Sequence, residues 1–181
     1  MQIAPAATKR WTLDEVDFVV ETSPGMTIRG RFDRVGGSYD VGADGIRIDL
    51  AVDTTSIDTG SGMWDALLRA ADARALTGNP QVRFRSTRVR ELGDGRLRID
   101  GRLEAGGRVE TVVFDAVVQE VAGGLRLEAA ATVDRRRLGK GADRFAVFLP
   151  AAVHVTMRLK DRTSSPRPSI STPSATSTTR S

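Results

Sequence analysis

Residues 53–87 read DTTSIDTGSGMWDALLRAADARALTGNPQVRFRST, and this stretch decides how the rest of the chain folds. Thr59 or Ser61 can cap a first helical turn, because a short hydroxyl side chain accepts hydrogen bonds from its free backbone N–H groups. Asn79-Pro80 then ends the helix and begins an extended run. The sequence therefore predicts a short helical insertion, at about residues 61–76, between two strands.

The predicted helix is amphipathic. Met63, Leu67 and Leu68 are spaced to form one apolar stripe, with Trp64 beside it. We expect these four residues to form a lid that packs against an otherwise all-β body.

Outside the insertion, the chain consists of short alternating strands separated by turn signals. Val16, Phe18 and Val20 alternate with more polar neighbours, and Asp44-Gly45 and Gly93-Asp94-Gly95 are typical hairpin turns. About eight strands follow one another in hairpin order. Closing such a sheet removes its two exposed edges. The sequence therefore predicts an all-β fold, a closed antiparallel barrel of about eight strands.

Composition divides the chain into three parts. Residues 1–10 have no pattern and read as a flexible leader, and residues 11–162 carry the predicted barrel. Residues 163–181 are rich in Ser, Thr and Pro, and such a tail buries too little apolar surface to order itself. No apolar run is long enough to span a membrane, and the first dozen residues lack the apolar centre of a signal peptide, so we expect a cytoplasmic protein.

The inward positions of the predicted barrel are aliphatic or aromatic. A barrel of about eight strands can be filled by side chains or can hold one small ligand. Small inward residues at Gly30, Ser86, Gly101, Ala129 and Ala131 would leave space, unless bulky neighbours fill it; spacing alone leaves both readings open. The residues expected to line a ligand-binding lumen are Phe18, Ile28, Phe32, Ile48, Leu50, Phe84, Leu97, Ile99, Phe114 and Leu127.

Residue scarcity restricts the chemistry. The chain has no Cys and one His, which excludes disulfides, thiolate metal sites and cysteine nucleophiles. His154 lies at an outward position and is interpreted as a surface residue. Asp58, Asp65 and Asp72 are interpreted as helix-capping residues and as partners of Arg69 and Arg74, rather than as an acid/base pair or a cation site. The sequence therefore predicts no catalytic residue, no metal and no enzymatic activity.

Arginine dominates the positive charge, with Lys+Arg 27 against Asp+Glu 23 and a net charge of +4. On the predicted hairpin of residues 83–102, arginines of one strand face arginines of the next. Like charges in such opposition are destabilising, which suggests a contact with phospholipid headgroups, a pyrophosphate or nucleic acid. The strand face lacks the aromatic residues that single-strand binders use, which argues against nucleic acid. The opposed arginines are Arg83, Arg85, Arg88 and Arg90 on one strand and Arg96, Arg98 and Arg102 on the other.

Several short motifs resemble the YceI-like family of lipid- and polyisoprenoid-binding proteins, in order from about Trp11 to Lys160. The motifs are Trp11-Thr12-Leu13-Asp14, Ile28-Arg29-Gly30-Arg31-Phe32, Ser56-Ile57-Asp58-Thr59-Gly60, Leu68-Arg69-Ala70-Ala71-Asp72, Asn79-Pro80-Gln81-Val82-Arg83-Phe84 and Val133-Asp134-Arg135-Arg136-Arg137-Leu138-Gly139. The resemblance implies a lipocalin-like barrel with a helical insertion, whose apolar lumen takes an isoprenoid chain or a similar amphiphile. It brings no catalytic residues.

The expected function is thus non-enzymatic binding of an apolar or isoprenoid-tailed lipid, such as a polyisoprenoid or a quinone, with no other cofactor. One alternative is a filled barrel that acts as a protein-interaction or scaffold module. Another is an anion or nucleic-acid binder that uses the Arg-rich hairpin of residues 83–102. A homodimer is compatible with any of these.

Overall fold

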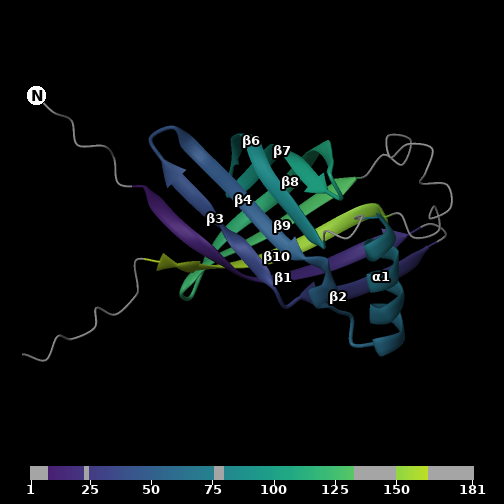
Figure 1. Cartoon of the computed structure of the whole chain (residues 1–181). Helices are drawn as coiled ribbons and strands as arrows, with labels where there is room; N and C mark the ends of the chain where they lie inside the picture. The colour runs from purple at the N-terminus through teal and green to yellow at the C-terminus, as the bar shows by residue number, and fades with distance from the viewer. Residues whose placement is uncertain (1–7, 23–24, 76–79, 133–149, 163–181) are drawn as a thin grey trace, which may run out of the picture.

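The computed structural model of the protein describes residues 8–22, 25–75, 80–132 and 150–162 (Figure 1). The elements in chain order are β1 (Lys9–Thr22), β2 (Met26–Phe32), β3 (Val35–Gly42), β4 (Gly45–Asp53), the 3-10 turn η1 (Thr54–Ser56), β5 (Ile57–Asp58), α1 (Gly62–Ala75), β6 (Gln81–Gly93), β7 (Arg96–Ala105), β8 (Arg108–Val121), β9 (Gly124–Thr132) and β10 (Pro150–Asp161). The predicted leader and tail lie mostly outside the described residues. The helical insertion is confirmed.

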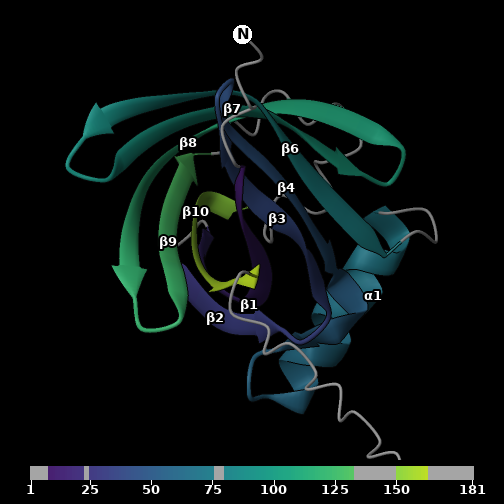
Figure 2. The same ribbon diagram turned by 90° about the vertical axis from the view of Figure 1, so that its left-hand side faces the viewer.

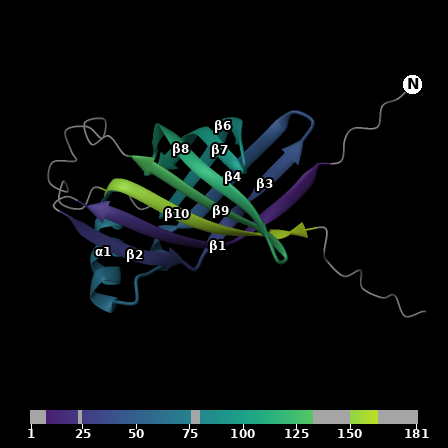
Figure 3. The same cartoon turned by 180° about the vertical axis from the view of Figure 1, so that it is seen from behind.

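Eight strands close into a ring in the order β10-β9-β8-β7-β6-β4-β3-β1, and β1 pairs with β10 to complete it. Every pairing is antiparallel. Figure 2 looks into the ring, with α1 outside it, and Figure 3 shows β10 running between β9 and β1. The prediction of a closed antiparallel barrel of about eight strands is confirmed.

Strand β1 divides the barrel wall. One of its edges pairs with β10 over nearly its whole length. The other edge pairs with β3 over residues 9–12 and with β2 over residues 16–22. On its far side, β2 pairs only with the two-residue strand β5 and not with a strand of the ring. Together with α1, these two strands form a layer beside the ring. This β2–β5–α1 layer is called the flap below.

The prediction that an unstructured leader extends to residue 10 was wrong. Lys9 and Arg10 already belong to β1, and Arg10 holds Asp40 of β3 through two hydrogen bonds of 2.6 and 3.1 Å. Lys9 and Arg10 are polar and exposed, so no apolar alternation marks the first residues of the strand. Further along β1, a register shift between Leu13 and Glu15 makes Asp14 an extra residue.

In one half of the barrel, here called the packed half, the inward side chains are almost fully buried. Its side chains are Trp11, Tyr39, Ile48, Leu97, Leu125 and Leu159, which are all at most 6% exposed. Trp11 and Tyr39 meet edge to face, with 5.7 Å between ring centroids. Burial, with a smaller effect of the Glu91 carboxylate, raises the pKa of Tyr39 to about 12. Its phenol therefore stays neutral, as suits an apolar core.

Glycine positions inside the barrel are not empty. A Cβ atom on Gly30 would lie 2.8 Å from Cζ of Phe18, and a Cβ atom on Gly101 would clash with the ring of Phe84. Each aromatic ring thus occupies the space that its neighbouring glycine leaves. Of the two readings that spacing left open, the structure shows filled space at these two glycines. Phe18 is paired directly with Gly30, and Phe84 reaches Gly101 from the position paired with Leu103.

Candidate functional site

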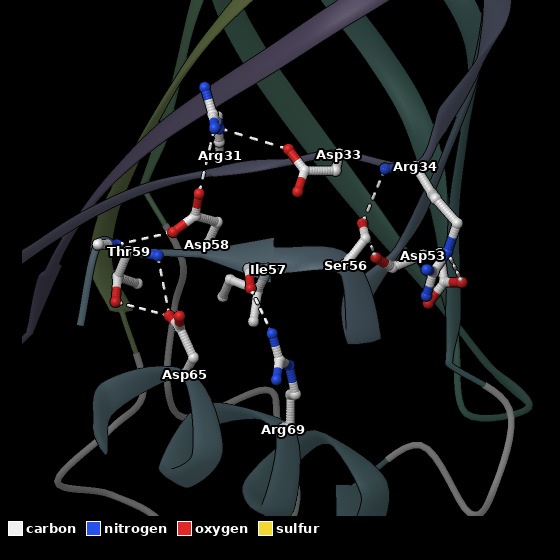
Figure 4. Close-up of polar contacts among 11 residues, drawn as sticks. Arg31, Asp33, Arg34, Asp53, Ser56, Ile57, Asp58, Thr59, Asp65 and Arg69 are labelled. Atoms are coloured by element: carbon white, nitrogen blue, oxygen red, sulfur yellow. Dashed lines mark hydrogen bonds and ion pairs between the residues drawn. The ribbon is translucent and has the colours of Figure 1, made fainter. Parts of the chain in front are cut away.

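The residues of 53–60 join the barrel to the flap through a polar network (Figure 4). Arg34, at the corner between β2 and β3, donates from Nε to Asp53 at 2.8 Å and from its backbone N–H to Oγ of Ser56 at 2.9 Å. The Ser56 hydroxyl in turn donates to the carbonyl of Asp53 at 2.6 Å. The resulting tight turn leaves Thr54 of η1 and Ile57 of β5 buried.

The start of α1 is fixed by Asp65. Its Oδ1 accepts from the backbone N–H of Thr59 at 2.8 Å and from the Thr59 hydroxyl at 2.7 Å. These bonds, the hydroxyl bond first, hold the pKa of Asp65 below its usual value. Of the two predicted caps, Thr59 donates its hydroxyl to the Asp65 carboxylate and accepts from the N–H of Ser61, at 3.4 Å, one residue before α1 begins.

The other acids near the helix are also structural. Asp58 accepts from the backbone N–H of Gly60 at 2.9 Å and from Arg31 at 3.2 Å. Arg69, which was predicted to pair with this group of acids, donates to the backbone carbonyl of Ile57 at 3.0 Å and so ties α1 to β5. Its charge is a smaller cause, after the bonds from Thr59, of the lowered pKa of Asp65. The side chains of Asp72 and Arg74 lie outside the described part of the structure.

An apolar cavity of about 360 Å³ lies between the flap and the half of the barrel opposite the packed half. Side chains from β2, η1, β5, α1 and every ring strand except β3 line it. The edge-to-face pair of Phe84 and Phe114, with centroids 5.2 Å apart, and the pair of Phe18 and Phe32, 5.0 Å apart, form part of its wall.

Most of the predicted lumen residues face this cavity. Those that line it are Phe18, Ile28, Phe32, Leu50, Phe84, Ile99, Phe114 and Leu127. Ile48 and Leu97 do not line it; each is 2% exposed and belongs to the packed half. The reason is their height along the barrel, since Ile48 pairs with Tyr39 and Leu97 with Ala116, beyond the hollow part.

Sequence reasoning missed other lining residues. Val16, Val20, Val153, Val155 and Met157 follow the same alternation and could have been chosen from it. Leu13 was hidden by the irregularity in β1, and Thr54 and Ile57 lie on a turn that has no period. The remaining lining residues that were not predicted are Val52, Val82, Leu103 and Ala129.

The four predicted lid residues have different surroundings. Leu68 lines the cavity, and Trp64 packs with it against Phe18, Ile28 and Ile57. Met63, in the first turn of α1, is 75% exposed, so its assignment to the lid was wrong. The Leu67 side chain lies outside the described part of the structure.

The cavity wall carries no ionisable side chain in the described part of the chain, and Thr54 is its one polar lining residue there. The Thr54 hydroxyl donates to the carbonyl of Pro80 at 3.0 Å, so its hydrogen is already engaged. Among the described residues, no group of His, Asp and Glu is placed to hold a metal ion. His154 is exposed on β10, opposite Val19 and Ala130. A wall of this composition favours a hydrocarbon ligand over a polar one.

The predicted arginine rows lie on the outer surface of β6 and β7. Arg83 holds Asp49 of β4 through bonds of 2.9 and 2.7 Å, and Arg85 approaches the same carboxylate at 3.4 Å. The motif at residues 133–139, with its three consecutive arginines, lies outside the described residues. No helix in the described part of the chain is long and apolar enough to cross a membrane.

Solved structures of similar fold cover most of the chain. The crystal structure of BcnA from Burkholderia cenocepacia is 17% identical, with a TM-score of 0.62, and the match covers 80% of this chain and 94% of that one. The YceI protein of Campylobacter jejuni is 15% identical, with a TM-score of 0.59 over 79% of this chain and 90% of its own. A polyisoprenoid binding domain from Saccharophagus degradans, implicated in plant cell wall breakdown, is 15% identical, with a TM-score of 0.50 over 86% and 99%.

Sequence relatives match over shorter stretches. A UPF0312 protein of Vibrio cholerae is 32% identical over 94 residues, 49% of each chain, so the match spans about half the length of that relative. Protein YceI of Shigella flexneri is 37% identical over 70 residues, 39% of this chain and 36% of its own. A family model for the YceI-like domain matches residues 11–160, the whole barrel together with the flap. The chain belongs to the YceI-like domain family.

Proposed function

We propose that the protein binds an apolar, isoprenoid-tailed lipid in the cavity between the barrel and the flap, and holds it without chemical change. The observation that carries this function is a cavity of about 360 Å³ whose described lining is hydrocarbon except for Thr54. The polyisoprenoid binding domain from Saccharophagus degradans, which shares the fold, supports the choice of ligand.

Apolar burial supplies the driving force. Removing hydrocarbon from water gains roughly 25 cal/mol per Å². Water is a poor occupant of this cavity, because it needs two or more polar partners and Thr54 has already donated its proton to Pro80. A hydrocarbon chain loses no hydrogen bond on entering.

The cavity volume limits how much of a ligand it can enclose. At about 360 Å³ it is near the lower end of the range of roughly 300–1,000 Å³ typical of ligand pockets. A few prenyl units fit inside, and a longer chain extends beyond the wall. A prenyl chain also has fewer freely rotating bonds than a saturated chain of equal length, so it loses less entropy when bound.

The same wall favours binding over catalysis. General acid–base catalysis needs a titratable group within hydrogen-bond reach of the reacting atom. The described wall holds none, and the Thr54 hydroxyl has no neighbouring base on the wall to activate it. A ligand inside meets only side chains that exclude water.

Organic extraction of the freshly purified full chain, followed by mass spectrometry, tests the function. We expect a prenyl-tailed lipid, and we expect delipidated protein to take up a short-tailed ubiquinone. Ala129→Phe should block uptake, because Ala129 lines the cavity and is 6% exposed. Ala130→Phe, one residue along β9 and outside the lining, is the matched control. No extractable lipid together with no ubiquinone uptake would refute binding, and equal uptake by both variants would refute binding in this cavity.

A further inference from the structure

The outer side of β4, β6 and β7 carries an unusual density of arginine. These side chains, called the basic face, are Arg47, Arg83, Arg85, Arg88, Arg90, Arg96, Arg98 and Arg102. The outward positions of the same three strands hold four acids, Asp49, Asp53, Asp100 and Glu104. The local excess of positive charge therefore equals the net charge of +4 of the whole chain.

A bulge in β6 places all its arginines on one side. Ser86 pairs with Gly101 and Arg88 with Asp100, so Thr87 is an extra residue. If the same sequence formed a regular strand with no bulge, Arg83 and Arg85 would face outward but Arg88 and Arg90 would face inward, because side chains alternate along a strand. The Thr87 hydroxyl donates to the carbonyl of Asp100 at 3.2 Å and holds the bulge in place. The backbone is thus shaped to keep four guanidinium groups in solvent.

Acids neutralise only part of the basic face. Arg83 and Arg85 share Asp49, Arg90 approaches Asp100 at 3.5 Å, and Arg98 approaches Asp115 at 3.4 Å. Four arginines of the basic face are exposed and have no ion-pair partner among the described residues. They are Arg47, Arg88, Arg96 and Arg102.

Like charges also oppose each other across the β6–β7 ladder. Arg85 pairs with Arg102, and Arg90 pairs with Arg98. Directly opposed like charges cost free energy in a sheet, and a bound anion removes that cost. Guanidinium groups bind phosphate through paired N–H donors, so the unpartnered groups suit a surface of phosphates.

We propose that the basic face docks the protein on an anionic phospholipid bilayer. The placement of the charges identifies the surface. The choice of a bilayer as its partner rests on the proposed lipid-binding function. Leu50, Phe84 and Ile99, on the inner side of the same strands, line the cavity. A carrier of a membrane lipid must meet the membrane. The outward positions of these strands hold no aromatic residue on which bases could stack, which disfavours single-stranded nucleic acid.

Co-sedimentation of the full chain with vesicles tests the docking. We expect binding to vesicles of phosphatidylcholine mixed with phosphatidylserine, weakening as salt rises, and none to phosphatidylcholine alone. The variant R88Q/R96Q/R102Q removes three arginines without breaking an ion pair of the described structure. Each arginine near an anionic membrane contributes about fivefold in affinity, so the variant should bind on the order of a hundredfold more weakly.

The matched control is R29Q/R108Q/R162Q, which removes three exposed arginines that lie off the basic face and have no ion-pair partner among the described residues. It should retain binding within a few fold. Equal losses in the two variants, or wild-type binding that ignores phosphatidylserine, would overturn the docking surface. So would binding of duplex DNA or single-stranded RNA, lost in R88Q/R96Q/R102Q, by a protein that ignores vesicles.

Vesicle binding by the basic face and lipid binding in the cavity can be measured separately in the same variant. R88Q/R96Q/R102Q should keep its urea unfolding midpoint and should yield the same extractable lipid as wild type. Loss of vesicle binding with lipid retained supports the basic face. Vesicle binding that persists in all variants overturns it, whatever the cavity contains.

Discussion

The ring of Phe84 lies against Gly101, and it fits there because glycine has no side chain. A Cβ atom there would clash with the ring and come within 2.6 Å of the Arg85 carbonyl. Gly101→Ala should therefore destabilise the protein by about 1–3 kcal/mol, the usual cost of overpacking a core. Urea unfolding measures it.

Gly36→Ala is the control for that substitution. Gly36 also lies in a strand, but nothing stands within 4 Å of its added Cβ atom. It should leave the unfolding free energy unchanged or slightly raised, because alanine has fewer unfolded conformations to lose. Equal effects at both glycines would mean that Phe84 can move aside and that the ring does not define the cavity wall.

Asp49 makes stability depend on pH. The hydrogen bond from Arg83 is the main cause that lowers the pKa of Asp49. A lowered pKa stabilises the fold above the unfolded value of about 3.9, and this contribution is lost as pH falls through the folded value. Because the pair is more than a third exposed, its worth is at most about 1 kcal/mol. Asp49→Asn should lower the unfolding free energy at pH 7 and should lower it less at about pH 3, below the unfolded pKa.

Urea unfolding at the two pH values checks this expectation. Glu120→Gln is the matched variant, since it removes an exposed carboxylate that has no ion-pair partner in the described part of the chain. It should shift stability little at either pH. A deficit of Asp49→Asn that persists unchanged in acid would show that the asparagine harms packing and that the charge is not the cause.

Among the elements, α1 depends on few contacts. Leu68 and Trp64 pack on Phe18, Ile28 and Ile57, and β5 joins β2 through only two residue pairs. Leu68→Ala should therefore speed amide hydrogen exchange throughout α1 without affecting β7 or β8, because regions with few buried contacts open locally. Mass spectrometry of peptic fragments resolves the two regions.

Met63→Ala is the corresponding control on the same helix. Met63 is 75% exposed, so its loss should leave exchange in α1 unchanged. If the two variants behave alike, Leu68 does not hold the flap. If exchange in β7 rises together with that in α1, the flap and the barrel unfold as one unit.

The strands show why a sequence pattern predicts elements better than their details. Regular alternation in β4, β7 and β9 gave the correct inner and outer faces. In β1 and β6 an extra residue, Asp14 or Thr87, reverses the alternation, and bulges of this kind leave no reliable trace in composition. The helix was predicted because Gly62–Ala75 lies between clear start and stop signals.

At the scale of the whole molecule, the sequence predicted the closed barrel because hairpin order and turn signals are local. The division into a packed half and a hollow half depends on how high each inward residue lies along the barrel, which register decides. Ile48 and Leu97 follow the same pattern as Leu50 and Ile99, but only the latter two reach the cavity. Which inward residues meet a ligand therefore could not be read from alternation alone.

The division into a packed half and a hollow half predicts that Leu→Ala costs more stability at one position of β7 than at another. Leu97 is 2% exposed in the packed half, whereas Leu103 is half-buried and lines the cavity. Leu97→Ala should cost about 2–5 kcal/mol in urea unfolding, because it opens a new void in close-packed surroundings. Leu103→Ala should cost less than about 2 kcal/mol, because its side chain already borders empty space.

Uptake of a short-tailed ubiquinone should show the reverse order. Leu103→Ala changes the wall that touches the ligand and should alter the dissociation constant several-fold, whereas Leu97→Ala, measured where it stays folded, should leave that constant unchanged. The two measurements together locate the boundary between the halves on a single strand. If Leu103→Ala destabilised the protein as much as Leu97→Ala and left uptake unaffected, side chains would fill the barrel along its whole length, and the ligand would bind elsewhere.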